Sequence, residues 1–237
     1  MISVCMATYN GQKYISKQLE SIIKNLSNND EIIISDDGSK DETLEIIQDY
    51  RKNFKNIKVY EGPHKGVKAN FENALRHASG EYIYLTDQDD IWMDNKVEMT
   101  QRFFKDSNVT LVIHDAAVID NNMDIVIGSF FSTRNSKSGI IKNIVKNSYI
   151  GCCMAFRKEI LDYILPIPDN IHMHDQWIGI ISEVVGKSVF IPEKLIYYRR
   201  HGENVSTMQH LPLRKMIRNR LVFVINLLKW EVRIKHG

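Results

Sequence analysis

The sequence is poor in cysteine and has no long apolar run. Its three cysteines, Cys5, Cys152 and Cys153, form no C-x-x-C pair and have no histidine at zinc-site spacing, which argues against a disulfide framework and a structural zinc site. The opening stretch ISVCMATYN lacks the basic and apolar regions of a signal peptide. No uninterrupted apolar run reaches the ~18 residues of a membrane-spanning helix. These absences predict a cytosolic protein with reduced, partly buried thiols.

Two glycine-rich nucleotide-binding patterns are also missing. Neither G-x-G-x-x-G nor a Walker loop occurs, which argues against an NAD enzyme and against a P-loop enzyme. An EF-hand is excluded as well, because Ile91 stands where that loop needs an oxygen ligand and Trp92 where it needs glycine. A bound nucleotide is therefore expected to be held through its base and a metal ion.

What the sequence does contain is an alternation of β-prone and helical segments. Apolar residues make up 43% and charged residues 25% of the 237 residues, which are ordinary globular values. In the first part of the chain the apolar patterns predict strands at 2–8, 31–35, 56–62 and 81–86, and between them helices at 12–27, 39–54 and 67–80. The helix at 39–54 opens with a capping-box pattern, Ser39 to Glu42. This order predicts a parallel sheet with right-handed crossovers.

The pattern is looser in the rest of the chain. Helices are predicted at 94–106, 157–165 and 175–185, and strands at 109–115, 125–131, 151–156, 188–192 and 194–201. We expect one globular domain with a C-terminal extension.

Polar residues follow three of the predicted strands at the point where each strand ends. They are the segments 8–10, 36–39 and 87–90, with the sequences TYN, DDGS and DQDD. Ligands collect at the carboxyl ends of parallel strands. We therefore expect these segments to line one rim of the sheet and to form the functional site.

Three of these polar residues, Asp87, Asp89 and Asp90, are carboxylates crowded together after a strand that is expected to be buried. Like charges at this spacing repel one another and resist desolvation. A hard divalent cation, Mg²⁺ or Mn²⁺, would compensate them, with substrate phosphates and water completing its shell. The alternative is that Asp89, Asp90 and Asp94 only cap the following helix. The residues alone leave both alternatives open.

Five motifs between Ile2 and about Ser206 carry a family resemblance. They are VCMATYNGQKYISKQLESI, IIISDDGSKDETLEII, GVKANFENALRHASGEYIYLTDQDDIW, HDQWIG and YYRRHGENVS. Together they resemble the inverting family 2 glycosyltransferases of the GT-A fold, and most of all a bacterial rhamnosyltransferase-like branch. The resemblance implies an α/β fold with a Rossmann-like, mainly parallel central sheet, flanking helices and a C-terminal helical extension.

The resemblance also implies a division of the chain. Residues 1–206 would form the glycosyltransferase domain, with a nucleotide-binding half at about 1–115 and an acceptor-binding half at about 116–206. Residues 207–237 would form a basic amphipathic C-terminal helix.

Roles for particular residues are implied in the same way. Asp89 would ligate Mn²⁺ or Mg²⁺ at the diphosphate, and His201, in the late motif, could reach the same metal. Asp175 would be the catalytic base. The residues implied to bind the nucleotide are Thr8, Tyr9, Asn10, Asp37 and Asp87. Those implied to lie near the diphosphate or the acceptor are Asp90, Trp92, Trp177 and Arg199.

Several of these residues also have a purely structural interpretation. Asp175 would serve as the N-cap of the helix that starts there, and Tyr9 would pack on the rim of the sheet. Trp92 and Trp177 would be core residues. Arg199, together with Arg200 and His201, would form an exposed basic edge.

The implied reaction is the metal-dependent, inverting transfer of a single sugar from a nucleotide sugar to a glycan or lipid-linked acceptor in bacterial surface polysaccharide synthesis. The branch favours dTDP-rhamnose as donor, with UDP-glucose or UDP-galactose next. The Q-x-x-R-W signature of processive members is missing. Two alternatives are a sugar-phosphate nucleotidyltransferase, for which only Gly11 and Lys13 suggest the necessary glycine-rich basic loop, and a non-catalytic sugar-nucleotide-binding protein.

The C-terminal segment is strongly basic. Residues 212–235 carry seven of the 31 Lys and Arg residues but one of the 29 acidic residues, and the stretch LVFVINLL lies between the charged ends. Such a helix fits an anionic membrane interface, which would place the protein on the inner face of the plasma membrane. The alternative is a helix packed on the domain. Nucleic acid is not an expected partner, because the segment is too apolar for phosphate contacts alone.

Overall fold

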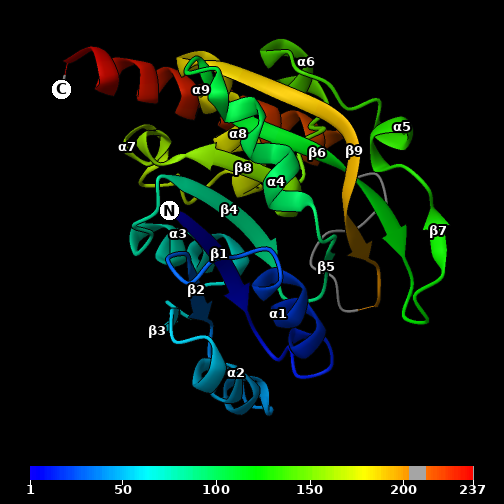
Figure 1. Cartoon of the computed structure of the whole chain (residues 1–237). Helices are drawn as coiled ribbons and strands as arrows, with labels where there is room; N and C mark the ends of the chain where they lie inside the picture. The colour runs from blue at the N-terminus through cyan, green and yellow to red at the C-terminus, as the bar shows by residue number, and fades with distance from the viewer. Residues whose placement is uncertain (203–211, 237) are drawn as a thin grey trace.

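A computed structural model of the chain describes residues 1–202 and 212–236. Its first part follows the predicted alternation of strands and helices (Figure 1). The strands are β1 (Ile2–Thr8), β2 (Glu31–Asp36), β3 (Ile57–Glu61) and β4 (Tyr82–Asp87). The connecting helices are α1 (Ile15–Ile23), α2 (Thr43–Asn53) and α3 (Val67–Arg76). The four strands pair in parallel in the predicted manner, in the order β3-β2-β1-β4.

The register of these strands brings their carboxyl ends together. Thr8 at the end of β1 pairs with Asp36 at the end of β2, and Ala7 pairs with Asp87 at the end of β4. The three polar segments of the sequence therefore begin at one edge of the sheet.

The second part of the chain extends this sheet by mixed pairing. Its strands are β5 (Ile91–Trp92), β6 (Val109–Ile119), β7 (Ile125–Ile127), β8 (Met154–Arg157) and β9 (Lys187–Arg199). The order continues β4-β8-β6-β9-β5, and β7 pairs with β6. Strand β8 is antiparallel to both β4 and β6, whereas β6 and β9 are parallel. The helices of this part are α4 (Lys96–Gln101), α5 (Phe130–Arg134), α6 (Ile140–Val145), α7 (Leu161–Ile164), α8 (His174–Val185) and α9 (Leu213–His236).

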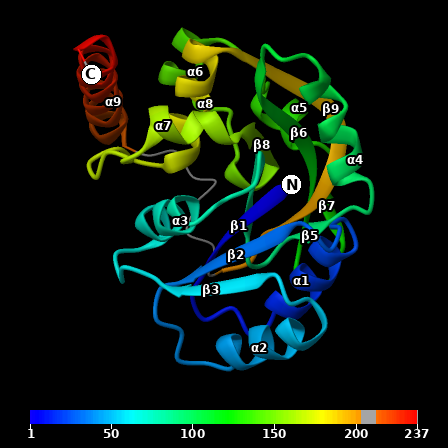
Figure 2. The ribbon, with the colours of Figure 1, turned by 60° about the vertical axis from the view of Figure 1, so that its left-hand side comes forward.

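Burial explains why the first strands could be predicted. Every residue of β1 and β2 is buried, because α3 covers one face of the parallel strands while α1 and α2 cover the other (Figure 2). Helix α1 buries Ile15, Leu19 and Ile22, which lie on one face of a 3.6-residue turn. The continuous apolar runs are thus the mark of strands that are buried on both faces.

Two predicted strands, 188–192 and 194–201, are joined in the structure as the single strand β9. The pairing of β9 with β6 slips between them, because His114 pairs with Ile191 whereas Asp115 pairs with Lys194. Pro192 lies in this slip, where its missing N–H costs no ladder hydrogen bond. A β-bulge therefore replaces the predicted break.

The predicted strand at 125–131 ends early, at Ile127. Ser129 caps the short helix α5 instead: its Oγ accepts a hydrogen bond from the Ser132 backbone N–H at 3.0 Å and donates to Asp115 at 2.5 Å. The strand predicted at 151–156 also starts late, because residues 151–153 form a 3₁₀ turn before β8. Helix α6 was not predicted.

The predicted capping box at Ser39 to Glu42 does not form. Helix α2 begins at Thr43 and has no side-chain cap. Ser39 is engaged elsewhere, since its Oγ donates to Asp36 at 2.6 Å and accepts from the Asn10 backbone N–H at 2.9 Å. The serine serves the loop after β2 and not the helix.

The predicted basic C-terminal helix is present as α9. Residues 203–211 lie outside the described residues. They include the end of the late motif, YYRRHGENVS, and the first residues of the predicted C-terminal helix. Within the described part of the chain, no helix combines the length and the apolarity needed to cross a bilayer.

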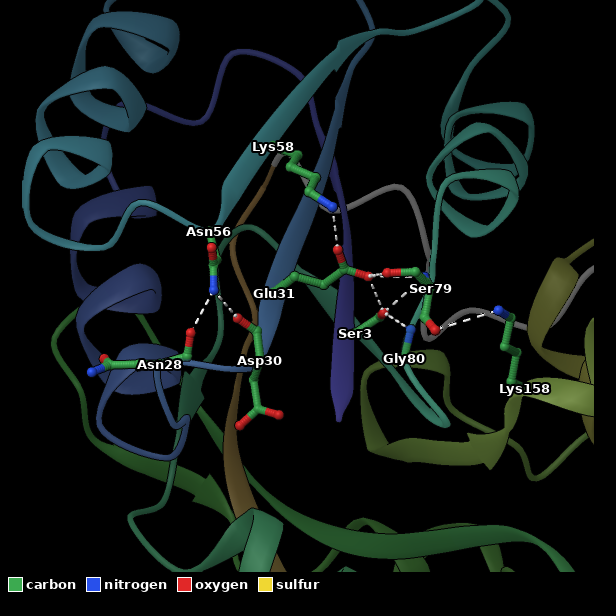
Figure 3. A network of polar contacts seen from close by, with 9 residues as sticks. All are labelled: Ser3, Asn28, Asp30, Glu31, Asn56, Lys58, Ser79, Gly80 and Lys158. Atoms are coloured by element: carbon green, nitrogen blue, oxygen red, sulfur yellow. Dashed lines mark hydrogen bonds and ion pairs between the residues drawn. The ribbon is translucent and has the colours of Figure 1, made fainter.

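A buried carboxylate joins the strands at the amino end of the sheet (Figure 3). Glu31 accepts hydrogen bonds from Ser3 Oγ at 2.5 Å, from Ser79 N and Oγ at 2.8 and 2.6 Å, and from Lys58 Nζ at 2.6 Å. Burial acts to raise the pKa of Glu31, but the hydrogen bonds outweigh it and lower the pKa to about 2. This charge is therefore fully compensated by the protein itself.

Candidate active site

Asp36 organises the rim where β1 and β2 end. Its Oδ1 accepts hydrogen bonds from Thr8 Oγ1 at 2.9 Å and from Ser39 Oγ at 2.6 Å, and its Oδ2 accepts from the backbone N–H groups of Gly38 and Ser39 at 3.1 and 2.8 Å. Gly38 has φ of 90°, a conformation that favours glycine. The Thr8 side chain is buried and fixes the loop after β2 through Asp36. Its hydroxyl group is therefore already hydrogen-bonded within the protein.

Tyr9 lies beside the loop that follows β4, and Asn10 lies beside the loop that follows β2. The backbone N–H of Tyr9 donates to Gln88 Oε1 at 2.9 Å, and Gln88 Nε2 donates to the Tyr9 carbonyl at 3.0 Å. A Cβ at Gly11 would lie 2.3 Å from Gln88 Oε1, so any larger residue there would displace the Gln88 side chain. Asn10 Oδ1 accepts from the Lys40 backbone N–H at 2.9 Å. Tyr9 is 54% exposed, and its ring is open to a ligand.

Asp37 offers an oxygen that the described residues leave without a partner. Its Oδ2 accepts from the Gly66 backbone N–H at 2.8 Å, whereas its Oδ1 is buried and unbonded within the described residues. Asn70 Oδ1 is in the same state, while its Nδ2 donates to the Thr8 carbonyl at 3.1 Å. A nucleobase edge or a ribose supplies the donors that such acceptors need.

Asp89 and His201 meet although they are far apart in the sequence. His201 Nε2 lies 2.7 Å from Asp89 Oδ2. The His201 ring stacks on Tyr14 at 4.8 Å between centroids, and the Arg199 guanidinium lies 5.2 Å from the same Tyr14 ring. Arg199 is buried and donates through Nε to the Asp89 carbonyl at 2.9 Å. The end of β9 is thereby fixed beside the loop after β4.

Asp90 links the same two segments. Its Oδ1 accepts from the Arg199 backbone N–H at 3.0 Å. Its Oδ2 is buried beside the Cys152 thiol and makes no hydrogen bond of normal geometry within the described residues. Asp90 Oδ1 thus fixes the backbone of β9 at Arg199, and Asp90 Oδ2 remains available to a ligand.

A buried lysine stands beneath the acidic cluster. Lys96 Nζ donates to the Cys152 carbonyl at 2.8 Å and lies 3.9 Å from the centroid of the Trp92 ring. Burial lowers the pKa of Lys96 to about 8, against the opposing attraction of the neighbouring thiols and of Asp90 and Asp87. Lys96 is thus a buried counter-charge of the cluster, in addition to Arg199.

Lys96 and the buried Arg199 do not prevent a rise in the pKa values of two of the clustered carboxylates. Burial, followed by repulsion from Asp89 and Asp175, raises the pKa of Asp87 to about 7. Burial and the repulsion of Asp89 and Asp87 raise the pKa of Asp90 well above its ordinary value. The electrostatic cost that the sequence predicted is therefore present, and a bound cation would relieve it.

The donor set fits a hard divalent cation. Asp87, Asp90 and Cys152 place one potential ligand atom each within 4.8 Å of one another. Burial raises the pKa of the Cys152 thiol well above its ordinary value, and a neutral thiol is a poor ligand for Mg²⁺ or Mn²⁺. The carboxylates of the cluster are therefore the residues that would hold such an ion.

Asp175 lies in the first turn of α8 and not at its cap. The N-cap position is Met173, and no side chain caps this helix. Asp175 Oδ1 accepts hydrogen bonds from the Gln176 backbone N–H at 2.6 Å and from Asn147 Nδ2 at 3.3 Å. Burial raises the pKa of Asp175 to about 6. The capping interpretation is therefore wrong, and Asp175 is close enough to Asp87 to raise the pKa of that residue.

The two tryptophans near the site lie in the core. Trp92 is 2% exposed and donates its indole N–H to Thr86 Oγ1 at 3.1 Å. Trp177 is 1% exposed and donates to the Ile164 carbonyl at 2.9 Å. This agrees with their structural interpretation, and neither ring surface is open to an acceptor.

Sequence reasoning missed three residues that shape the site. Lys96 had a usable signal, because it shares a helical face with the buried Thr100 and Phe104 at spacings of four residues. Gln88 lies in the predicted segment 87–90, but its contact with Tyr9 could not be predicted, and Asn147 had no signal, since each acts through a contact with a distant segment.

The chain belongs to a known family. Residues 3–165 match the family described as Glycosyl transferase family 2. Among curated relatives, the dTDP-rhamnosyl transferase RfbG of Shigella flexneri is 29% identical over 219 residues, which cover 84% of this chain and 72% of RfbG. The UDP-Glc:alpha-D-GlcNAc-diphosphoundecaprenol beta-1,3-glucosyltransferase WfgD of Escherichia coli is 28% identical over 189 residues, covering 77% of this chain and 70% of WfgD. The matches span between 60% and 77% of the curated relatives' own length.

Solved structures show the same fold. TarS of Staphylococcus aureus in complex with UDP-GlcNAc superposes with a TM-score of 0.74 at 20% identity, covering 95% of this chain and 66% of that one. The mannosyltransferase PcManGT of Pyrobaculum calidifontis, in complex with GDP-Man and Mn²⁺, superposes with a TM-score of 0.63 at 18% identity, covering 100% of this chain and 64% of that one. The α/β architecture is thus the GT-A fold that the motifs predicted.

Proposed function

We propose that this chain is a metal-dependent, inverting glycosyltransferase that moves a single sugar from a nucleotide sugar to a glycan or lipid-linked acceptor in bacterial surface polysaccharide synthesis. The observation that carries the proposal is that carboxylates from two separate segments of the chain lie close together. The crowded cluster of Asp87, Asp89 and Asp90 lies at and after the end of β4, and its member Asp87 is within electrostatic reach of Asp175 on α8. Membership in glycosyltransferase family 2 supports a nucleotide sugar as the donor class.

The donor that we favour is dTDP-rhamnose, with UDP-hexoses next. By their names, the relatives RfbG and WfgD are a dTDP-rhamnosyl transferase and a UDP-Glc glucosyltransferase, which supports these two donor classes. The exposed ring of Tyr9 would stack on the base, and Asp37 Oδ1 would accept a hydrogen bond from its edge. Thr8 and Asn10 would keep the loop after β1 in place.

Asp89 and His201 would ligate the metal, beside the grouped carboxylates of Asp87 and Asp90, and Asp87 would lie close to the ribose or the ion. A bound Mn²⁺ or Mg²⁺ would stabilise the negative charge that develops on the leaving diphosphate. The Mn²⁺ in the complex of PcManGT supports this assignment. Arg199 would hold both metal-site segments together through its contacts with Asp89 and Asp90.

Asp175 would act as the general base. In a single displacement the acceptor oxygen forms a bond to the anomeric carbon, the bond to the diphosphate breaks, and the hydroxyl proton passes to the carboxylate. A pKa of about 6 keeps Asp175 mostly ionised at neutral pH while leaving it basic enough to accept that proton. Asn147 and the Gln176 N–H both bind Oδ1, so Oδ2 would face the acceptor.

The acceptor is proposed from chemistry and likeness together. WfgD acts, by its name, on a sugar joined to diphosphoundecaprenol, which supports a lipid-linked acceptor. We propose transfer of one sugar per encounter, which the absence of Q-x-x-R-W in this sequence supports.

The proposed function is tested by incubating the protein with a panel of nucleotide sugars, Mn²⁺ and simple glycan or lipid-linked acceptors. Release of a nucleoside diphosphate together with a glycosylated acceptor is the expected result. Release of pyrophosphate would identify a nucleotidyltransferase instead. Donor binding without turnover of any acceptor would favour the non-catalytic alternative.

A further inference from the structure

Helix α9 is attached to the protein by one of its faces. Phe223 and Trp230 are buried on that face, at 2% and 7% exposure. The Phe223 ring packs edge-on against Trp177 of α8 with centroids 5.8 Å apart. The Trp230 indole donates to the Tyr163 carbonyl of α7 at 2.7 Å, and Arg220 Nε donates to the Val145 carbonyl of α6 at 2.8 Å. These contacts fix the orientation of the helix.

The opposite face of α9 is apolar and exposed. Seven large apolar side chains recur on it at helical intervals and are 36% to 68% exposed: Leu213, Ile217, Leu221, Val224, Ile225, Leu228 and Val232. At about 3.6 residues per turn they form one stripe that points away from Phe223 and Trp230. Figure 2 shows α9 at the edge of the molecule, with no other element beyond it. We call these seven residues the outer stripe.

Cations border the outer stripe. Arg214, Lys215 and Arg218 line a hollow of about 570 Å³ together with Asn170 and Asn219, and none of the three cations forms an ion pair within the described residues. Farther along the helix Lys229 is exposed in the same way. The one acidic residue of α9, Glu231, is bound by Lys235 at 2.6 Å. The border of the stripe therefore carries a strong net positive charge.

We propose that the outer stripe docks into the headgroup region of an anionic lipid bilayer, with Arg214, Lys215 and Arg218 on lipid phosphates. An apolar stripe rimmed by cations is the surface that lies in such an interface. A second copy of this chain is a poorer occupant, because pairing two outer stripes would bring the cationic borders against each other. The helix lies on the membrane and does not cross it, since it is too polar to span. This inference stands on the surface of α9 and is independent of the proposed reaction.

The apolar part of the surface is tested by flotation with vesicles. Wild-type protein should float with vesicles of equal parts phosphatidylglycerol and phosphatidylcholine and remain unbound with phosphatidylcholine alone. The double variant Leu221→Ser/Leu228→Ser should lower the partition coefficient about tenfold or more, because two exposed leucines that would insert into the membrane are replaced by polar side chains. The matched control Val126→Ser/Ile141→Ser changes two exposed apolar residues outside α9, at 56% and 79% exposure, and should bind as wild type does. Circular dichroism checks that each variant is folded.

The cationic border is tested by charge reversal. Arg214→Glu/Arg218→Glu should lower the partition coefficient by about 20-fold or more and remove most of its salt dependence. The control Lys55→Glu/Lys105→Glu makes the same change of charge at exposed sites elsewhere and should have a much smaller effect.

Two outcomes would overturn the proposal. The first is a folded wild-type protein that does not float with anionic vesicles, or one that floats equally well with the Leu221→Ser/Leu228→Ser change. The second is a wild-type dimer in light scattering that becomes monomeric with this change, since the outer stripe would then be occupied by a second copy.

Discussion

The two ends of the same parallel sheet treat carboxylates in opposite ways. At the amino end, Glu31 is buried but receives hydrogen bonds from Ser3, Ser79 and Lys58, and its pKa is lowered to about 2. At the carboxyl end, Asp87 is crowded by other acids, and burial raises its pKa to about 7. The backbone pairing is equally regular at both ends, so the contrast comes from the side chains alone.

This contrast separates a carboxylate that stabilises the fold from carboxylates that await a ligand. Glu31 has a protein partner for each of its oxygens, and its charge favours the folded state. Asp90 has one oxygen on a backbone N–H and a second, buried oxygen without a normal hydrogen bond within the described residues. Groups with raised pKa values gather at functional sites, and here they gather where the parallel strands end.

The largest effect is expected at Asp175. Asp175→Asn should lower turnover by ~10²-fold or more, because the amide cannot accept the proton of the acceptor hydroxyl. Donor affinity should stay near the wild-type value, and the melting temperature should be unchanged or higher, because a buried charge is removed. The control Asp162→Asn changes an exposed acid and should leave turnover intact. Near-wild-type turnover of Asp175→Asn would remove this residue from the chemistry.

The second largest effect is expected at Glu31, at the amino end of the sheet. Glu31→Gln should lower the free energy of unfolding at pH 7 by about 2–3 kcal/mol, because a shift of one pKa unit corresponds to about 1.4 kcal/mol. The folded-state pKa of Glu31 is depressed, so its contribution is present above its ordinary pKa and is lost as pH falls towards about 2. Denaturant unfolding at several pH values measures this. A gap between variant and wild type that stays constant down to acid pH would contradict the account, and Glu45→Gln on the exposed side of α2 is the control.

The smallest effect is a pH dependence. Burial raises the pKa of Asp175 to about 6, and only the ionised form accepts a proton. The turnover number should therefore rise as pH increases through about 6 and fall about tenfold for each unit below it. The test range is about pH 5 to pH 7, roughly one unit on either side of the Asp175 pKa. A turnover number that is constant over this range would show that Asp175 is not the titrating base.

Local patterns allowed much of the fold to be predicted. β1 and β2 are buried on both faces, and α1 carries an apolar stripe, so sequence period and length were sufficient for them. The second part of the sheet was harder, because its pairing depends on distant partners. The bulge at Pro192 and the recruitment of Ser129 by Asp115 are set by β6, and no local pattern reveals them.

The candidate site was predictable to a similar extent. Strand order placed Asp37 and Asp87 at one rim, and the structure has them there: the Asp37 backbone N–H donates to the Thr8 carbonyl at 2.9 Å, and Asp87 pairs with Ala7. The pairing of Asp89 with His201 was suggested only by family motifs, because 112 residues separate the two. Lys96 was overlooked, since a lysine in a helix is usually exposed and here it is buried under Trp92.

The central claim is that the carboxylates at the carboxyl end of the sheet bind a cation that is needed for donor binding. The most direct test is thermal denaturation of wild type, of Asp89→Asn and of the exposed control Asp94→Asn. Each protein is measured alone, with Mn²⁺, with a nucleotide sugar, and with both. We predict that Mn²⁺ and donor together stabilise wild type and Asp94→Asn by about 2–3 kcal/mol at saturating ligand. We predict that Asp89→Asn keeps its basal stability but loses this gain, because an amide is a poor ligand for a hard cation. An equal gain in all three proteins would contradict the account.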